Sequence, residues 1–399
     1  MAELDLAPIL LNAAGVGAGL LGIAAVALLS RPARLPGYSL ALMALLAILV
    51  LDVASSIFDL GPWARALPQW GGTSYLLWPW IPVLLWAYVA ELTATERQSL
   101  RKFGAHIAAA CLGMALYLPT VLLPASDKLA LADGTLRLVA PRHAIMALGL
   151  LGFILLWIGH ILVAFRLIMR RLVAHRARMR DLLSDVEAVD LRWLNGFGMF
   201  ISLGIAVVVA DNLGAIFMGR EVLSASAGAL YEALIIAGLA LFGLTQQAAV
   251  PAWATDIEKQ AEQPPSEEPF PEATRYAKSS LSKADCEAIL ARLDKAMTSG
   301  EPWRDPFLNL KILAERITIK PYYVTQALNT VLQRNFYDYV NGWRARAAAQ
   351  ALIASNASVL SICEDVGFNS KSTFNAAFRK EMGTTPSAYR KAQQGATLE

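Results

Sequence analysis

Two short stretches near the C-terminal end of this 399-residue sequence place amide, hydroxyl and basic side chains on one face of an expected helix. On the first stretch, which begins at Pro321, that face carries Tyr322, Thr325, Gln326 and Asn329. On the second, which begins after Ser370, it carries Lys371, Ser372, Asn375 and Arg379. Amides and hydroxyls can hydrogen-bond the edges of bases, and basic side chains can hold phosphates. The chemistry open to these two faces is therefore contact with a nucleic acid.

Each face belongs to the second helix of a unit that reads as helix, turn, helix. The units are expected at about 309–333 and 358–383. Pro321 occupies the first position of its helix, where proline is tolerated, and Gly367 supplies a turn in which positive φ is easy for glycine. Residues suited to begin three of the four helices as N-caps are Asn309, Ser358 and Ser370.

A longer helix, expected from Phe336 to about Ala354, joins the two units. Its apolar residues recur at helical spacing and predict one buried stripe, with Arg344 and Arg346 beside it. Two units joined in this way can place their second helices in successive major grooves, about 34 Å apart on one face of B-DNA. Across 303–395, twelve Lys or Arg stand against six Asp or Glu, a net charge of +6 that suits such a partner.

The first 248 residues have a different composition. The whole chain is 56% hydrophobic and 17% charged, against a usual charged share of about 25%, and the excess of apolar residues lies in this part. Seven stretches are long enough to cross a bilayer, which requires about 20 apolar residues. They are residues 8–30, 38–59, 74–92, 104–123, 143–168, 194–217 and 227–248. The third is interrupted by Pro79 and Pro82. The sequence thus predicts an all-α protein, a seven-transmembrane helical bundle followed by a soluble domain.

The distribution of Lys and Arg in the short loops predicts the orientation of these spans. Twelve basic residues fall on one side and five on the other, and the more basic side is cytoplasmic. With seven spans, the N-terminus lies outside and the C-terminal region lies in the cytoplasm, as expected for a multi-pass protein of a bacterial inner membrane. The segment 170–193 on the cytoplasmic side is either a helical hairpin or an extension of the fifth span.

Several ionisable or polar side chains lie at membrane depth, where they are costly and are functional candidates by default. They are Asp52, His160, Asp211, Asn212 and Glu232. Asp211 and Glu232, in the sixth and seventh spans, are expected at one depth near the outer surface, where the pair could act as a proton-linked or cation-linked switch. The alternatives are structural polar pairs or acids that face water near the interface. The three cysteines have no metal-binding spacing, and neither a cofactor nor a metal site is expected.

A linker separates the two parts. Residues 249–280 contain five prolines and six acids against three basic residues, which predicts a segment without a core of its own. The expected domains are therefore residues 1–248, a sensor of seven helices, and residues 281–399, a DNA-binding domain.

The stretch 308–390 resembles the DNA-binding domain of the AraC/XylS family of bacterial transcription regulators. The matching features are LKILAERI, NFYDYVNGWR and SICEDVGFNSKSTFNAAFRKEMGTTPSAYR, which together cover about a fifth of the chain. Two positions depart from the family pattern. Lys320 stands where a small capping hydroxyl is usual, and Cys363 stands where alanine is usual. The first departure puts the reading of DNA by the first unit in doubt.

The resemblance also implies roles for individual residues. It implies base contacts for Tyr322, Thr325 and Gln326 in the first unit and for Lys371, Ser372 and Asn375 in the second. It implies phosphate contacts for Arg379 and Lys380. Asn329 completes the outward face of the first unit and is counted with the DNA-binding residues.

The leading hypothesis is a membrane-anchored one-component regulator, which is not an enzyme. Its expected partners are double-stranded promoter DNA, the membrane and an unidentified signal ligand, with a homodimer and RNA polymerase as further candidates. The alternatives are a membrane enzyme or transporter with a regulatory tail, and a seven-span receptor whose tail is a protein scaffold. An enzyme would need a denser set of intramembrane polar groups than Asp52, Asp211 and Glu232. A scaffold would not need the exposed polar face around Asn375.

Overall fold

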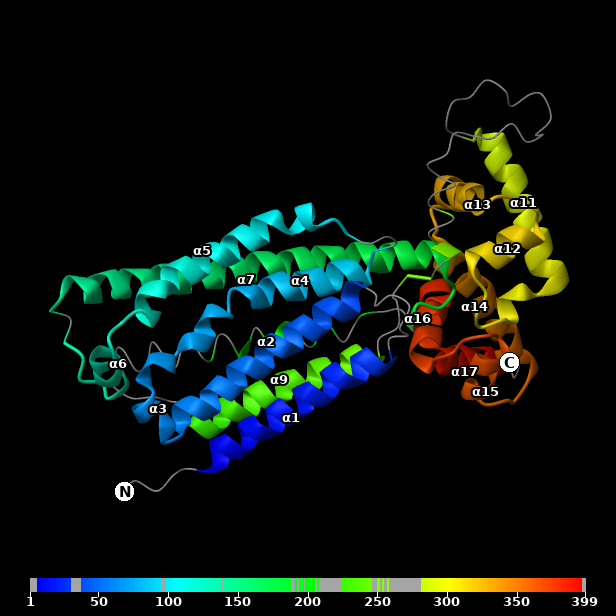
Figure 1. Cartoon of the computed structure of the whole chain (residues 1–399). Coiled ribbons are helices and arrows are strands. Elements are labelled where there is room, and N and C mark those ends of the chain that lie inside the picture. The colour runs from blue at the N-terminus through cyan, green and yellow to red at the C-terminus, as the bar shows by residue number, and fades with distance from the viewer. Residues whose placement is uncertain are drawn as a thin grey trace. The chain divides into compact units, whose positions relative to one another are not determined.

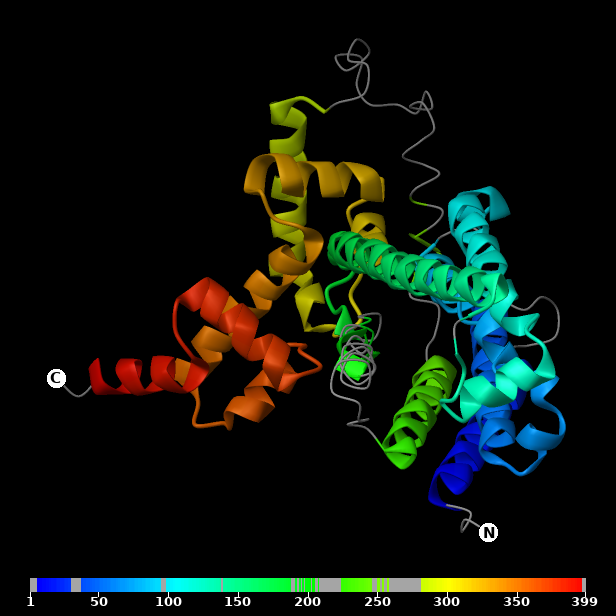
Figure 2. The same cartoon turned by 90° about the vertical axis from the view of Figure 1, so that its left-hand side faces the viewer.

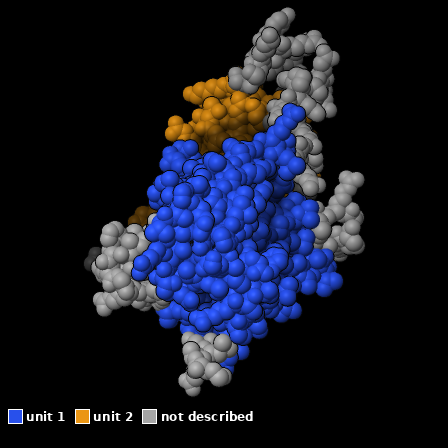
Figure 3. Space-filling view, turned by 60° about the vertical axis from the view of Figure 1, so that its left-hand side comes forward, with its two compact units in different colours: residues 1–172, 191–249 blue, residues 173–190, 250–399 orange. Residues whose placement is uncertain are grey.

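The structure is a computed structural model of the chain. It describes residues 6–29, 37–94, 98–137, 139–187, 224–245 and 281–396, with single positions between 191 and 207 and between 250 and 257. Apart from turns and one antiparallel bridge between Leu183 and Asn309, the ordered elements among these residues are helices (Figure 1). They form two compact units, residues 1–172 with 191–249 and residues 173–190 with 250–399 (Figure 3). The all-α fold expected from the sequence is confirmed.

The first unit is made of long apolar helices. Its described helices are α1 (Leu6–Leu29), α2 (Gly37–Leu60), α3 (Trp63–Ala66), α4 (Trp80–Leu92), α5 (Gly104–Val121), α6 (Ala125–Ala132), the first part of α7 (Pro141–Leu182) and α9 (Ala225–Thr245). Three 3-10 turns accompany them, η1 (Pro68–Trp70), η2 (Thr73–Leu76) and η3 (Leu100–Phe103). Among the residues that the structure describes, six segments are long and apolar enough to cross a membrane: Leu6–Leu29, Gly37–Leu60, Pro68–Leu92, Leu100–Val121, Pro141–Leu182 and Ala225–Gly243.

Small residues bring α1 close to α2 and α9, and the three helices lie side by side in Figure 1. A Cβ atom on Gly19 would lie 2.3 Å from Cγ2 of Val50, and one on Gly22 would lie 2.6 Å from Cβ of Ala240. Glycine at these positions allows the close backbone approach that is typical of helices packed within a membrane. Large leucines remain on the outer surface of the unit, including Leu28 at 84% exposure. The apolar helices and this surface suggest insertion in a membrane.

The third expected span is not one regular helix. The regular helix α4 starts only at Trp80, with Pro79 at its N-cap, and 3-10 turns precede it. Over 74–92 the structure thus combines 3-10 turns with the regular helix α4, which begins directly after Pro79 and contains Pro82 in its first turn. The segment Pro68–Leu92 as a whole is still one of the candidate spans. Most of the expected sixth span, including Asp211 and Asn212, lies outside the described residues.

The second unit contains both helix-turn-helix elements, which Figure 2 shows from a second side. Its described helices after α7 are α11 (Lys283–Gly300), α12 (Leu310–Arg316), α13 (Pro321–Ala327), α14 (Phe336–Ala354), α15 (Val359–Asp365), α16 (Lys371–Met382) and α17 (Pro386–Ala396). A 3-10 turn, η6 (Pro302–Arg304), precedes α12, and a π-helical turn, η7 (Leu328–Leu332), continues α13. The bounds of α14 are those expected from the sequence.

The expected N-caps are confirmed. The side chain of Asn309 accepts a hydrogen bond from the amide of Ile312, that of Ser358 from Ser361, and that of Ser370 from Thr373. Gly367 has φ of +85° and Gly383, which ends α16, has φ of +77°. These local signals fix where α12 and α15 begin and where α16 begins and ends.

Candidate nucleic-acid interface

Helix α16 separates its two faces sharply. Phe374 and Phe378 are completely buried, and their rings pack edge to face with centroids 5.7 Å apart. On the opposite side Lys371, Ser372 and Arg379 are exposed, and Asn375 is half-buried. The aromatic pair anchors the helix in the core, so the polar face is presented on a firmly held element.

Ion pairs with α14, and with Arg334 just before it, hold the C-terminal half of α16. Nζ of Lys380 lies 2.8 Å from Oδ1 of Asp338, and Glu381 pairs with both Arg334 and Arg346. The sequence pattern implied a phosphate contact for Lys380. In the structure this side chain already has an acidic partner, whereas exposed Arg379 has none among the described residues.

At the N-terminus of α16, two carboxylates approach from a segment far away in the sequence. Glu187 accepts hydrogen bonds from the hydroxyls of Ser370 and Thr373. Oδ2 of Asp185 accepts from Nδ2 of Asn369 at 2.5 Å. Sequence reasoning did not select Glu187, Asp185 or Thr373. The available signal was that three acids follow the basic stretch 170–182, and it did not indicate which surface they contact.

Helix α13 of the first helix-turn-helix unit is shorter than α16, and some of its polar groups are already hydrogen-bonded or buried. Tyr322 is 39% exposed and Asn329 is exposed on η7. The hydroxyl of Thr325 donates to the carbonyl of Pro321 at 3.3 Å. Oε1 of Gln326 is buried without a hydrogen-bond partner among the described residues. Only part of the expected reading surface of this unit is therefore directed outward and available.

Arg344 on α14 is buried at 1% exposure, whereas the sequence pattern placed it beside the apolar stripe. Its guanidinium donates to the carbonyls of Trp303 at 2.7 Å and Asp305 at 2.8 Å, and to Oγ of Ser184 at 3.1 Å. Burial lowers the pKa of Arg344 to about 10, and the acids Asp185 and Asp305 oppose this shift. The arginine remains charged at neutral pH and ties segment 183–187 to the core of the second unit.

The sensing candidates in the first unit have several contacts. Oδ1 of Asp52 accepts a hydrogen bond from Nε1 of Trp78 at 3.0 Å, and α2, which carries Asp52, packs against α9, which carries Glu232. Because Asp211 lies outside the described residues, its pairing with Glu232 stays a prediction. His160 is paired: its Nε2 lies 2.9 Å from Nδ1 of His106.

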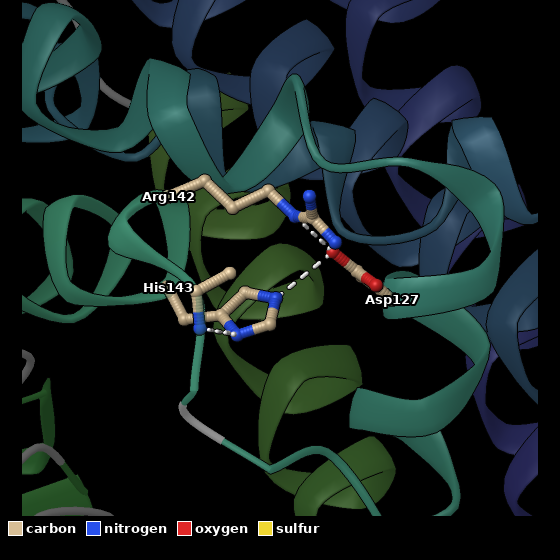
Figure 4. Close-up of polar contacts among 4 residues, drawn as sticks. Asp127, Arg142 and His143 are labelled. Carbon is tan, nitrogen blue, oxygen red and sulfur yellow. Dashed lines mark hydrogen bonds and ion pairs between the residues drawn. The ribbon is translucent and has the colours of Figure 1, made fainter.

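A second polar cluster lies between α6 and the start of α7 (Figure 4). Oδ2 of Asp127 accepts from Nε of Arg142 at 2.7 Å and contacts Nε2 of His143 at 3.0 Å. These hydrogen bonds, first that of Arg142, hold the pKa of Asp127 below its usual range. The sequence analysis did not select this cluster. Among the described residues no group of three or more potential metal ligands occurs.

Two helix-turn-helix units on a common long helix, with polar outward faces, define a DNA-binding transcription regulator. Residues 313–392 match the family described as Helix-turn-helix domain. The chain is 30% identical to the regulatory protein SoxS of Escherichia coli K12 over 86 residues, which are 22% of this chain and 80% of SoxS. It is 29% identical to the regulatory protein PocR of Salmonella typhimurium over 100 residues, 25% of this chain and 33% of PocR.

A third relative, the melibiose operon regulatory protein of Escherichia coli K12, is 29% identical over 90 residues, 23% of this chain and 30% of that protein. The chain belongs to the AraC-like family of transcription regulators. These three similarities cover about a quarter of the chain or less.

Proposed function

We propose that this protein is a membrane-anchored one-component transcription regulator. In this proposal the apolar helices of the first unit hold the chain in the cell membrane. The second unit binds promoter DNA in the cytoplasm, under the control of a signal sensed within the membrane or outside the cell. The observation that carries the proposal is the presence, in one chain, of apolar helices long enough to span a bilayer and of two helix-turn-helix elements in a region that matches a helix-turn-helix family.

The proposed reading residues fall into two groups. Base edges are read by Tyr322, Thr325, Gln326 and Asn329 of the first unit and by Lys371, Ser372 and Asn375 of the second. Arg379 and Lys380 contact phosphates. Exposed Arg379 supports its assignment, whereas Lys380 must leave Asp338 or share its charge with it.

The proposed topology follows the distribution of basic residues, with the N-terminus outside and residues 281–399 in the cytoplasm. A signal ligand, a homodimer and contact with RNA polymerase belong to the same proposal. Asp52, Asp211 and Glu232 are its sensing candidates. Asp52 on α2 and Glu232 on α9 lie on helices that pack against each other, and this placement supports a shared role for these two acids.

The test uses the full-length protein in lipid nanodiscs. It is incubated at low salt with a pool of random DNA duplexes, and the retained duplexes are sequenced over several rounds. We expect enrichment of one sequence, with binding that weakens steeply as salt rises, because phosphate contacts release counterions. A pool that stays random at low salt would contradict the proposal. In cells, a reporter protein fused to the C-terminus should indicate that the C-terminus lies in the cytoplasm. A C-terminus exposed outside the cell would exclude DNA binding.

A further inference from the structure

Segment 184–187 follows directly on α7 and is fixed to the second unit. The hydroxyl of Ser184 donates to the carbonyl of Leu308 at 2.6 Å, and the carbonyl of Ser184 accepts from Nδ2 of Asn341 at 3.2 Å. Val186 is buried in the same hydrophobic core as α14 and α16. These contacts place the two acids of the segment, Asp185 and Glu187, at the N-terminus of α16 without requiring any further ordering of the chain.

The groups that bind Glu187 are suited to an anion. The N-terminus of a helix carries free amides and the positive end of the helix dipole, and for this reason it is a common phosphate site. Ser370 and Thr373 add two hydroxyls, both of which donate to the carboxylate. The amide of Glu187 in turn donates to Oδ1 of Asp185 at 2.9 Å, which holds the two acids in one arrangement.

The same groups cannot serve DNA at the same time. Each hydroxyl has a single proton to donate, and in the structure both protons point to Glu187. A phosphate of the DNA backbone brought to the N-terminus of α16 would find the hydroxyl protons of Ser370 and Thr373 already donated to Glu187. It would also meet the negative charges of Glu187 and Asp185 at short range, and like charges repel.

We infer that the segment 184–187 is an internal mimic of DNA phosphate, which occupies the anion site at the N-terminus of α16 and holds the second reading helix in a masked state. Release of Glu187 from Ser370 and Thr373 exposes the site to a backbone phosphate. The segment is continuous with α7, which contains the fifth candidate span. A change in that span therefore has a direct covalent route to the mask. The inference rests on the proposed DNA-binding function.

The experiment compares the full-length protein with Glu187→Gln and Glu187→Ala in nanodiscs. The probes are one random-sequence duplex and the best duplex selected by the parent protein from a random pool, or by Glu187→Ala if the parent selects none. A matched control is Glu287→Gln on α11, which removes one negative charge from the same unit at an exposed position. We expect both Glu187 variants to bind more tightly by about 5- to 150-fold, the usual range for coupling between two sites. The control should change binding by no more than about twofold, as expected for an exposed charge.

The outcomes separate the inference from the proposed function. If the parent binds DNA and the Glu187 variants bind equally or more weakly while resisting protease like the parent, Glu187 only caps the helix and the mask is excluded. If only the Glu187 variants bind, both the mask and the proposed function are supported. If neither parent nor variants bind any duplex at low salt, the proposed function itself fails and the mask fails with it. A variant that unfolds is replaced in the comparison by Asp185→Asn, which weakens the same arrangement through Asn369.

Discussion

The turn between α12 and α13 has four residues, 317–320, whereas the turn between α15 and α16 has five, 366–370. The first contains Thr318 with φ of +56°, and the second contains Gly367 with φ of +85°. Lys320 at the N-cap of α13 makes no side-chain cap, whereas Ser370 caps α16. A β-branched residue in the left-handed region is strained, and a missing cap leaves helix amides without a side-chain partner. In the second helix-turn-helix unit the turn is therefore less strained, and the second helix better capped, than in the first helix-turn-helix unit.

This difference suggests a division of labour between the two units. Helix α16 has twelve residues and a left-handed glycine at its C-terminus, whereas α13 has seven and continues into a π-helical turn. The acidic segment 184–187 also contacts the second helix-turn-helix unit, at Asn369, Ser370 and Thr373. We expect sequence discrimination and regulation to depend more on the second unit than on the first.

The largest effect of a single substitution on stability is expected in the turn between α15 and α16, in the second helix-turn-helix unit. A Cβ atom at Gly367 would lie 2.6 Å from the carbonyl oxygen of Arg304, and the backbone has positive φ. Gly367→Ala should therefore lower the free energy of unfolding by about 3 kcal/mol or more. Urea-dependent proteolysis of the second unit in the full-length protein measures the loss. If the variant and the parent are equally stable, the turn can relax around the added methyl group. The two helix-turn-helix units then differ less in local stability than their backbone angles and caps indicate.

The next effect concerns base reading. Asn375→Ala and Gln326→Ala should each reduce preference for the selected duplex over a random one by about 1–3 kcal/mol. Because Oε1 of Gln326 is buried, we expect the smaller loss at Gln326 and the larger at Asn375. Competition binding with the two duplexes gives both values. Arg379→Ala is the control, since loss of a phosphate contact should weaken both duplexes alike. A larger loss at Gln326 would reverse the proposed ranking of the units.

A smaller effect should come from supplying the missing cap. Lys320→Ser places a hydroxyl at the N-cap of α13, where such groups contribute about 1 kcal/mol. The unfolding midpoint in urea should rise, whereas Lys311→Ser on the exposed surface of α12 should leave it unchanged or slightly lower. If Lys320→Ser shows no gain, the backbone around α13 does not have the geometry to use a cap.

The smallest expected effect is at Cys363, whose counterpart in the first unit is the buried Ala314. Burial raises the pKa of the Cys363 thiol to about 11, so its reactive thiolate is scarce at pH 8. Iodoacetamide should leave Cys363 unmodified in the folded protein and modify it after denaturation. The folded state holds this proton more tightly, so the contribution of the thiol to stability is present below about pH 9 and is lost as pH rises toward 11. Rapid labelling at pH 8 would show that α15 opens.

Local chemistry made the helix-turn-helix units predictable. Asn309, Ser358 and Ser370 cap their helices, and Gly367 has the expected left-handed turn, because each of these signals acts within a few residues. The burial of Arg344 was not predictable, since a positive charge next to an apolar stripe ordinarily faces water. Its partners Trp303, Asp305 and Ser184 are brought to it only by the tertiary fold.

The contacts of Glu187 were hidden for the same reason. The acid lies 183 residues before Ser370 in the chain, and no periodicity or motif connects the two positions. In residues 1–248, composition located the six apolar segments that the described residues show as candidate spans, whereas most of the expected sixth span lies outside those residues. The pairing of His106 with His160, and that of Asp52 with Trp78, depend on helix rotation, which hydropathy does not specify.

The contact between Ser184 and Arg344 has a consequence for biosynthesis. The two residues are 160 positions apart, and the ribosome adds about 5–20 residues per second. Segment 183–187 is therefore synthesised roughly 10–30 s before Arg344. The residues made in the interval include the last apolar helix, α9, and the linker. The polar contacts between segment 183–187 and Arg344 can therefore form only after the intervening residues have been translated. Until Arg344 has been synthesised, segment 183–187 is open to chaperones and proteases.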